Sequence, residues 1–153
     1  MRFNYDPLVL KKARTAVIAY AVGILIAAGL FFVPMLLGQT FEWSYQHLIF
    51  AFVTAFLMYQ LFRSIRLCRA VRASYVSVER EVVTGTDNCR STGPSEPFSV
   101  RPEMIRSAEI IRKDVLPIGR VRAIRLVCDD DEHVVFGIGQ LDELLLELMK
   151  YRT

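Results

Sequence analysis

Two long stretches without a charged side chain limit what this chain can fold into. Residues 15–37 (TAVIAYAVGILIAAGLFFVPMLL) and residues 45–62 (YQHLIFAFVTAFLMYQLF) contain no Asp, Glu, Lys or Arg. A helix of about 17 to 25 mostly apolar residues crosses the hydrocarbon core of a bilayer. Because lipid offers no partner to an unpaired backbone N–H or C=O, each stretch should be helical throughout. The sequence therefore predicts a transmembrane helical hairpin.

The hairpin divides the chain into two expected units. Residues 1–72 are expected to form the membrane unit, in which residues 1–14 are an amphipathic lead-in whose Phe3 and Tyr5 lie at the headgroup level. Residues 73–153 are expected to form a separate cytoplasmic domain, and about 80 residues suffice for one compact core. The chain of 153 residues is 53% hydrophobic, and this apolar excess is concentrated in the hairpin.

Basic residues flank the two outer ends of the hairpin but not its connecting loop. They are Arg2, Lys11, Lys12 and Arg14 before the first stretch, and Arg63, Arg66, Arg69 and Arg72 after the second. The connecting residues 38–44 contain Glu42 and neither Lys nor Arg. The positive-inside rule therefore predicts that both chain ends are cytoplasmic. The first stretch exceeds the apolar core of about 7 to 15 residues in a signal peptide, so we expect no cleavage.

Small residues on the first stretch predict close helix packing. Ala19, Gly23 and Ala27 recur at every fourth position and therefore share one helix face. Small side chains let the backbone of another helix approach closely. The second stretch is the favoured partner, because it follows after a short gap, and a contact between copies in a homo-oligomer is the alternative.

Each membrane surface has its own group of residues. Phe41, Trp43 and Tyr45 are predicted to form an aromatic belt at the outer interface. At the inner surface, the four arginines between residues 63 and 72 recur every third residue on a basic stalk that continues the second helix. Their side chains can reach lipid phosphates. Two interpretations of this stalk remain open, a topology anchor, which is favoured, and specific recognition of lipid headgroups.

Residues 73–153 have the period of strands, followed by that of one helix. In the segment RVRAIRLVC, Ile124, Leu126 and Cys128 alternate with other residues and are expected to face inward. Segments rich in Gly, Pro, Ser and Asn separate this strand from earlier ones. Residues 140–151 are expected to form a helix, because leucines at 141, 144, 145 and 148 make one apolar face. The prediction is an α+β chain with a small antiparallel β domain and a C-terminal amphipathic helix.

The segments SYVSVEREVVTG, PFSVRPEMIRSAEII and RVRAIRLVCDDDEHVVFGIGQLDELLLELMKY follow one another between residues 74 and 152. This order resembles the bacterial pleckstrin-homology-like (PH-like) domains of small membrane proteins, with an opening strand pair, a short strand, a long hairpin and a C-terminal helix. Two transmembrane helices before the domain are a further similarity. The resemblance implies a partly open PH-like barrel and a location in the bacterial cytoplasmic (inner) membrane. It transfers no binding residue to this chain.

Candidate chemistry is sparse. Residues 129–132 are all acidic and precede His133, and four acids could hold a hard cation. Successive strand residues point to opposite faces, however, so a solvated hairpin turn is the expected structure. Cys68, Cys89 and Cys128 lack the spacing of a metal site and should stay reduced in the cytoplasm. Because no catalytic motif is present, we expect no catalytic residue, metal, cofactor or enzyme activity.

We therefore expect a non-enzymatic integral membrane protein. The leading hypothesis is a membrane-anchored cytoplasmic module that docks a protein partner or serves as an accessory or assembly subunit of a membrane complex. A second hypothesis is a sensor of anionic lipids. A third, an accessory subunit of a transporter, needs a polar path, for which His47, Thr54 and Gln60 are the candidates. Membrane lipids are expected contacts, and nucleic acid is not.

Overall fold

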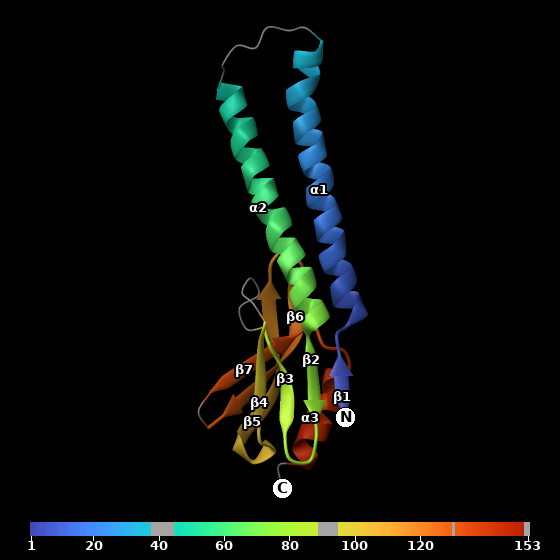
Figure 1. The fold of residues 1–153 in the computed structure, drawn as a ribbon, viewed down its shortest axis with the longest axis vertical. Coiled ribbons are helices and arrows are strands. Elements are labelled where there is room, and N and C mark those ends of the chain that lie inside the picture. Colours follow the sequence, from blue (N-terminus) through green and yellow to red (C-terminus); the bar gives the residue numbers. More distant parts are fainter. Residues whose placement is uncertain (38–44, 89–94, 130, 152–153) are drawn as a thin grey trace.

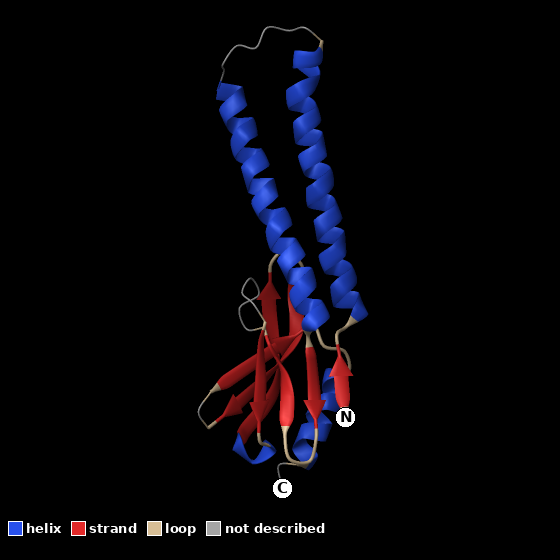
Figure 2. Ribbon diagram, viewed as in Figure 1, coloured by secondary structure: helices blue, strands red, loops and turns tan. Residues whose placement is uncertain are grey.

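Two long antiparallel helices project from one end of a small domain built from two β-sheets (Figure 1). The computed structural model describes residues 1–37, 45–88, 95–129 and 131–151. The predicted connecting loop with Phe41 and Trp43 lies outside the described residues, as does Cys89. Figure 2 separates the two parts of the molecule, with the helical pair at one end and the strands at the other.

The helices are α1 (Pro7–Leu36) and α2 (Tyr45–Ala73). Both extend beyond the predicted charge-free stretches on the side of the domain. Asp6 precedes α1, and its Oδ1 accepts a hydrogen bond of 2.7 Å from the Leu8 N–H. A side-chain acceptor at this position satisfies a helix-end donor, and proline is tolerated in the first turn. The Asp6-Pro7 pair therefore explains where α1 begins.

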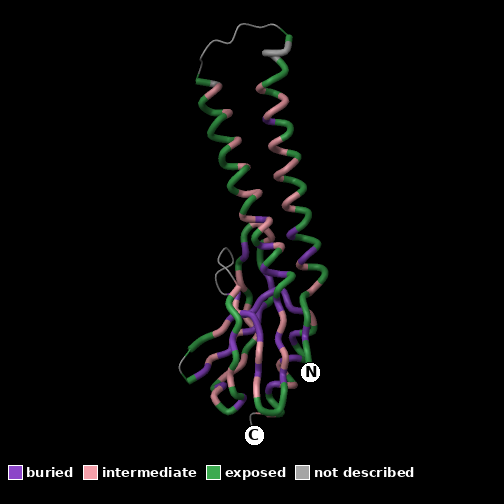
Figure 3. Tube along the Cα trace, viewed as in Figure 1, coloured by how far each residue is buried: buried purple, intermediate pink, exposed green. Residues whose placement is uncertain are grey.

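The upper parts of both helices are outside the protein core. In the most apolar 18-residue window of each helix, only 6% of the residues are buried. Leu25 and Phe52, for example, are 71% and 75% exposed. Figure 3 shows the same contrast between the mostly exposed helices and the buried interior of the domain. By length and composition, both helices are long and apolar enough to cross a membrane.

The strands form two antiparallel sheets in sequential order. The first sheet contains β1 (Arg2–Asn4), β2 (Tyr75–Val78), β3 (Val83–Asp87) and β4 (Glu96–Val100). The second contains β5 (Ile105–Val115), β6 (Gly119–Cys128) and β7 (Glu132–Phe136). A 3-10 turn, η1 (Pro102–Met104), joins the sheets, and α3 (Leu141–Lys150) follows the last strand. The predicted α+β layout with a C-terminal helix is confirmed.

The first residues of the chain correct the expected domain division. Phe3 is not at the headgroup level, because β1 pairs with β2 and places Phe3 opposite Val76. Only 2% of Phe3 is exposed, and it belongs to the core between the sheets. An aromatic ring removes more apolar area from water in such a core than at an interface. The β domain therefore includes residues 2–4, and the helical pair is inserted between its first and second strands.

The main core lies between the two sheets and α3. Ile124, Leu126 and Cys128 are buried there, as the alternation in the sequence predicts. On α3, Leu144 is fully buried, and Leu141 and Leu148 are buried beside it. The apolar face of α3 therefore packs into the core shared by the two sheets.

A second core joins the helices to the domain. Leu10 and Ala13 of α1 and Leu67 and Val71 of α2 pack against the outer face of the second sheet. Their partners on the sheet are Val115, Val121, Ala123, Val134 and Phe136. A Cβ atom added at Gly137 would lie 3.2 Å from Val71 Cγ1, and Gly137 has a φ of +74°. Glycine at this position therefore permits both the turn after β7 and the close approach of α2.

Polar groups complete the joint between α2 and the sheets. Asn88, which is 2% exposed, donates from Nδ2 to Ser74 Oγ at 2.8 Å and to the Phe136 carbonyl at 3.1 Å. Its Oδ1 accepts from the Phe136 N–H at 2.8 Å. Thr86 Oγ1 donates to the carbonyl of Ala73, the last residue of α2, at 2.8 Å. These bonds fix the end of the helix to β3 and β7, so the base of the helical pair is part of the folded domain.

We expect the substitution Phe3→Ala to destabilise the domain by about 3–5 kcal/mol, because it removes a fully buried ring. The measurement is urea unfolding of the full chain in detergent, followed by pulse proteolysis of the domain. Tyr5→Ala is the matched control, since Tyr5 is 41% exposed, and Phe3→Leu should cost much less than Phe3→Ala. Equal unfolding midpoints for Phe3→Ala and the unchanged chain would contradict the role of β1 in the core.

Candidate functional site

The basic parts of α1 and α2 end within one helical turn of each other. A Cβ atom added at Gly23 would lie 3.6 Å from Leu57 Cδ1, which sets these two residues opposite each other. Antiparallel helices each rise about 1.5 Å per residue. Moving equally far toward the domain, Val17 lies level with Arg63. Nine residues from the same contact, Arg14 lies level with Arg66, so the charged parts of the two helices begin about 4.5 Å apart along the helix axis. The domain is attached below this level.

The three predicted packing residues have different surroundings. Gly23 lies against Leu57 of α2, and Ala27 is buried. Ala19 is exposed and lines a groove on the side of α1. Tyr45, the described residue of the predicted aromatic belt, is the first residue of α2 and is 86% exposed.

A groove lies where α1 meets the domain, and we call it the α1 groove. It has a volume of about 750 Å³. One wall is the face of α1 from Leu8 to Ala19, and another is the β5–β6 turn with Pro117 and Ile118. Gly139 to Leu141, at the start of α3, form its lower side. The groove therefore extends from the domain to the charge-free part of α1.

The α1 groove is basic. Lys11, Lys12, Arg120 and Arg122 line it, and Asp6 is the acidic residue among its lining side chains. Arg122 Nη2 lies 2.6 Å from Asp142 Oδ1, and this hydrogen bond holds the pKa of Asp142 below its ordinary value. Arg120 Nε lies 3.2 Å from Asp114 Oδ1. Among the described residues, Lys11 and Lys12 make no ion pair, so the groove has an excess of positive charge.

The stalk arginines are divided between different surfaces. Arg69 and Arg72 line a second groove of about 380 Å³ together with Arg14 of α1, and we call it the arginine groove. The Arg66 guanidinium lies 4.5 Å from the centre of the Phe62 ring. Arg63 is half-buried, and its Nε has no hydrogen-bond partner among the described residues. The stalk also packs against the domain, because Leu67, Ala70 and Val71, which lie between the arginines, are buried.

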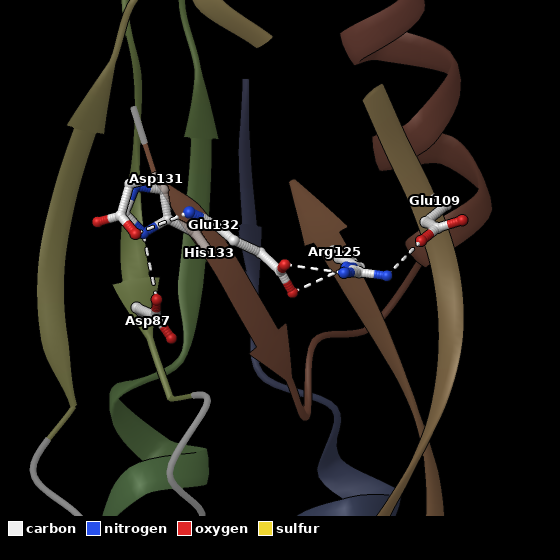
Figure 4. Close-up of polar contacts among 6 residues, drawn as sticks. All are labelled: Asp87, Glu109, Arg125, Asp131, Glu132 and His133. Carbon is white, nitrogen blue, oxygen red and sulfur yellow. Dashed lines mark hydrogen bonds and ion pairs between the residues drawn. The ribbon is translucent and has the colours of Figure 1, made fainter. Parts of the chain in front are cut away.

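The acidic residues after β6 form part of a surface network on the second sheet (Figure 4). Arg125 bonds both carboxylate oxygens of Glu132, at 2.7 and 2.8 Å, and also Glu109 at 3.2 Å. The bond from Arg125 is the main reason why the pKa of Glu132 is lowered. Asp131 Oδ1 accepts from the Glu132 N–H instead of turning toward a shared centre. Among the described residues, no group of three or more potential ligands could hold a metal ion.

His133 faces away from this network, toward the first sheet. Its Nδ1 lies 3.1 Å from Asp87 Oδ2, and its ring stacks on Phe98 with 4.4 Å between the ring centres. The carboxylate, the imidazole and the aromatic ring come from β3, β7 and β4. This contact holds the two sheets together, and it was not predicted because the three residues are far apart in the sequence.

A third groove lies at the end of the domain far from the helices, and we call it the distal groove. Its volume is about 680 Å³. Arg80, Glu81, Arg101, Glu103, Met104 and Tyr151 are among the residues that line it. Methionine, tyrosine and arginine are residue types enriched at protein contact surfaces.

Comparisons with known proteins add no family to these observations. A scan against models of known protein families finds no match to this chain, and a search of curated proteins finds none either.

We expect Arg125→Gln to raise the pKa of Glu132, because the substitution removes the charged donor that lowers it. A lowered pKa in the folded state contributes stability above the ordinary carboxyl pKa of about 4.3, which is lost as the pH falls through the folded value. NMR titration of the Glu132 carboxyl carbon is the measurement. Arg106→Gln, which removes the partner of Asp129 instead, should leave the Glu132 titration in place, and an equal response to both substitutions would contradict the assignment.

Proposed function

We propose that α1 and α2 cross the bacterial cytoplasmic membrane as a hairpin, with both chain ends in the cytoplasm. In this proposal the β domain is a non-enzymatic, PH-like module at the inner membrane surface. It docks a protein partner or serves as an accessory or assembly subunit of a membrane complex.

The attachment of the helices to the domain is the observation that carries this proposal. The second core and the bonds of Asn88 leave no flexible linker between α2 and β2. A hairpin in a bilayer would therefore hold the domain at one height and in one orientation. The distal groove would point away from the lipid, toward the cytoplasm, where a partner protein can reach it.

Two further observations support the membrane arrangement and the PH-like assignment. The exposed apolar side chains of both helices require a nonpolar surrounding, which lipid supplies. Sheets of four and three sequential antiparallel strands, followed by one helix, agree with the order of elements expected from the resemblance. The insertion of the hairpin between β1 and β2 gives such a domain a membrane anchor without an added linker.

Anionic-lipid sensing is the second candidate function. It is favoured by the α1 groove and the arginine groove, because both place basic side chains where the charge-free stretches end. Basic residues at this height can bind lipid phosphates in addition to fixing the topology.

The orientation predicts which cysteines an impermeant reagent can reach. In a chain with Cys68 and Cys89 replaced by Ser, we expect Ser99→Cys on β4 to react with an impermeant maleimide only after the cells are permeabilised. Ser44→Cys, in the predicted outer loop, should react in intact cells. Cys128 should stay unlabelled in the folded domain, because burial raises the pKa of its thiol. Labelling of Ser99→Cys in intact cells would overturn the orientation.

Protein docking predicts a crosslink that depends on position. A photoreactive amino acid at Arg101, in the distal groove, should give a discrete adduct with another protein in native membranes. The matched control is the same group at Glu109, on the outer face of the second sheet, which should give no such adduct. If both positions give only the uncrosslinked chain, and the chain leaves mild detergent as a monomer, the docking proposal is wrong.

A further inference from the structure

We propose that the α1 groove binds the phosphate-bearing headgroup of an anionic phospholipid from the inner leaflet, with an acyl chain of that lipid against Ala16 and Ala19. This inference rests on the proposed membrane arrangement. It assigns a ligand class to residues outside the arginine stalk that the sequence singles out.

The height of the groove is the first argument. Lys12, Ala16 and Ala19 recur at helical spacing, so they form one face of α1, and all three line the groove. Lys12 belongs to the basic end of the helix, whereas Ala19 lies within the charge-free stretch. One end of the groove would therefore open at the depth of the acyl chains and the other at the depth of the headgroups. A single lipid molecule has this same order of apolar and charged parts.

The charges in the groove are the second argument. Lys11 and Lys12 on α1 face the same space as Arg120 and Arg122 on β6. Asp6 is the one acidic residue that lines the groove, and its Oδ1 already accepts the Leu8 N–H bond that caps α1. Arg120 and Arg122 each contact one carboxylate through a single nitrogen, and a guanidinium has five N–H donors. Donors therefore remain for a phosphate, which arginine and lysine bind well.

The turn beside the groove is the third argument. Leu116, at the tip of the β5–β6 turn, is 60% exposed, and Pro117 and Ile118 follow it. Because Pro117 and Ile118 share the groove with Ala16 and Ala19, this apolar tip reaches the charge-free part of α1. The β2–β3 turn at the far end of the domain carries Glu79, Arg80 and Glu81 instead. The β5–β6 turn is thus suited to contact with lipid, and the β2–β3 turn is suited to contact with water.

An acidic protein segment fits these observations less well than a lipid does. A peptide would need an approach from water, whereas the upper wall of the groove lies in a stretch without charged side chains. Small residues at positions 16 and 19 leave space beside α1 that an acyl chain can fill.

The test uses the full chain in nanodiscs with equal amounts of phosphatidylglycerol and phosphatidylcholine, and native mass spectrometry of the lipids that stay bound. We expect the unchanged chain to retain phosphatidylglycerol preferentially. The double substitution Lys12→Glu, Arg120→Glu should lower this retention at least about tenfold. Each basic residue near an anionic surface adds to the free energy of lipid binding, and each substitution replaces an attractive charge with a repulsive one. Ala19→Leu, which fills the apolar end without changing charge, should also lower the retention.

A double substitution with the same change in charge is the control. Arg80→Glu, Arg101→Glu alters the distal groove, far from the membrane in the proposed arrangement, so it should leave the preference largely intact. Unchanged retention in the Lys12, Arg120 variant would overturn the site, as would an equal loss in the distal-groove variant. Displacement of the lipid by soluble glycerol phosphate would also overturn it, because the acyl chain would then contribute nothing.

Resistance of each variant to alkaline extraction from membranes separates this inference from the proposed function. A chain that stays inserted but shows no lipid preference contradicts the α1 groove alone. Extraction of the unsubstituted chain would contradict the membrane arrangement itself.

Discussion

The pairing of β1 with β2 is the interaction on which the rest of the structure depends. Helix α1 leaves the domain directly after β1, and β2 follows directly after α2, so this pair of strands closes the base of the helical pair. Asn4 and Asp6 extend the contact across the domain, since the Asn4 carbonyl accepts from the Gly139 N–H and the Asp6 N–H donates to the Gly137 carbonyl. The first residues of the chain thus join the first sheet to the segment after β7.

The local elements could be predicted from the sequence because their signals are local. Charge-free runs identify the two helices, and the alternation of Ile124, Leu126 and Cys128 identifies a strand with one buried face. The strand β1 could not be found in this way, because three residues give no measurable period. Its identity depends on pairing with residues 75–77, which lie beyond both helices.

The candidate site could be predicted only in part, for a similar reason. The basic residues next to the hairpin are visible in the sequence, but the α1 groove combines Lys11 and Lys12 with Arg120 and Arg122. In the sequence, the lysines resemble topology signals and the arginines resemble the outer residues of a strand. The second core brings them together, because it packs the base of α1 onto β6. Surface ion pairs such as Arg120–Asp114 contribute little to stability, so these arginines can bind an outside anion at little cost to the fold.

The place of β1 in the chain has a consequence for how the protein is assembled. During synthesis, β1 is made first, but its partner strand is made only after both helices. If one helix alone entered the bilayer, the two strands would be left on opposite sides of the membrane and could never meet. In the proposed membrane arrangement, completion of the sheet would therefore be a check on biogenesis, since only chains in which both helices insert, or neither does, could pair β1 with β2.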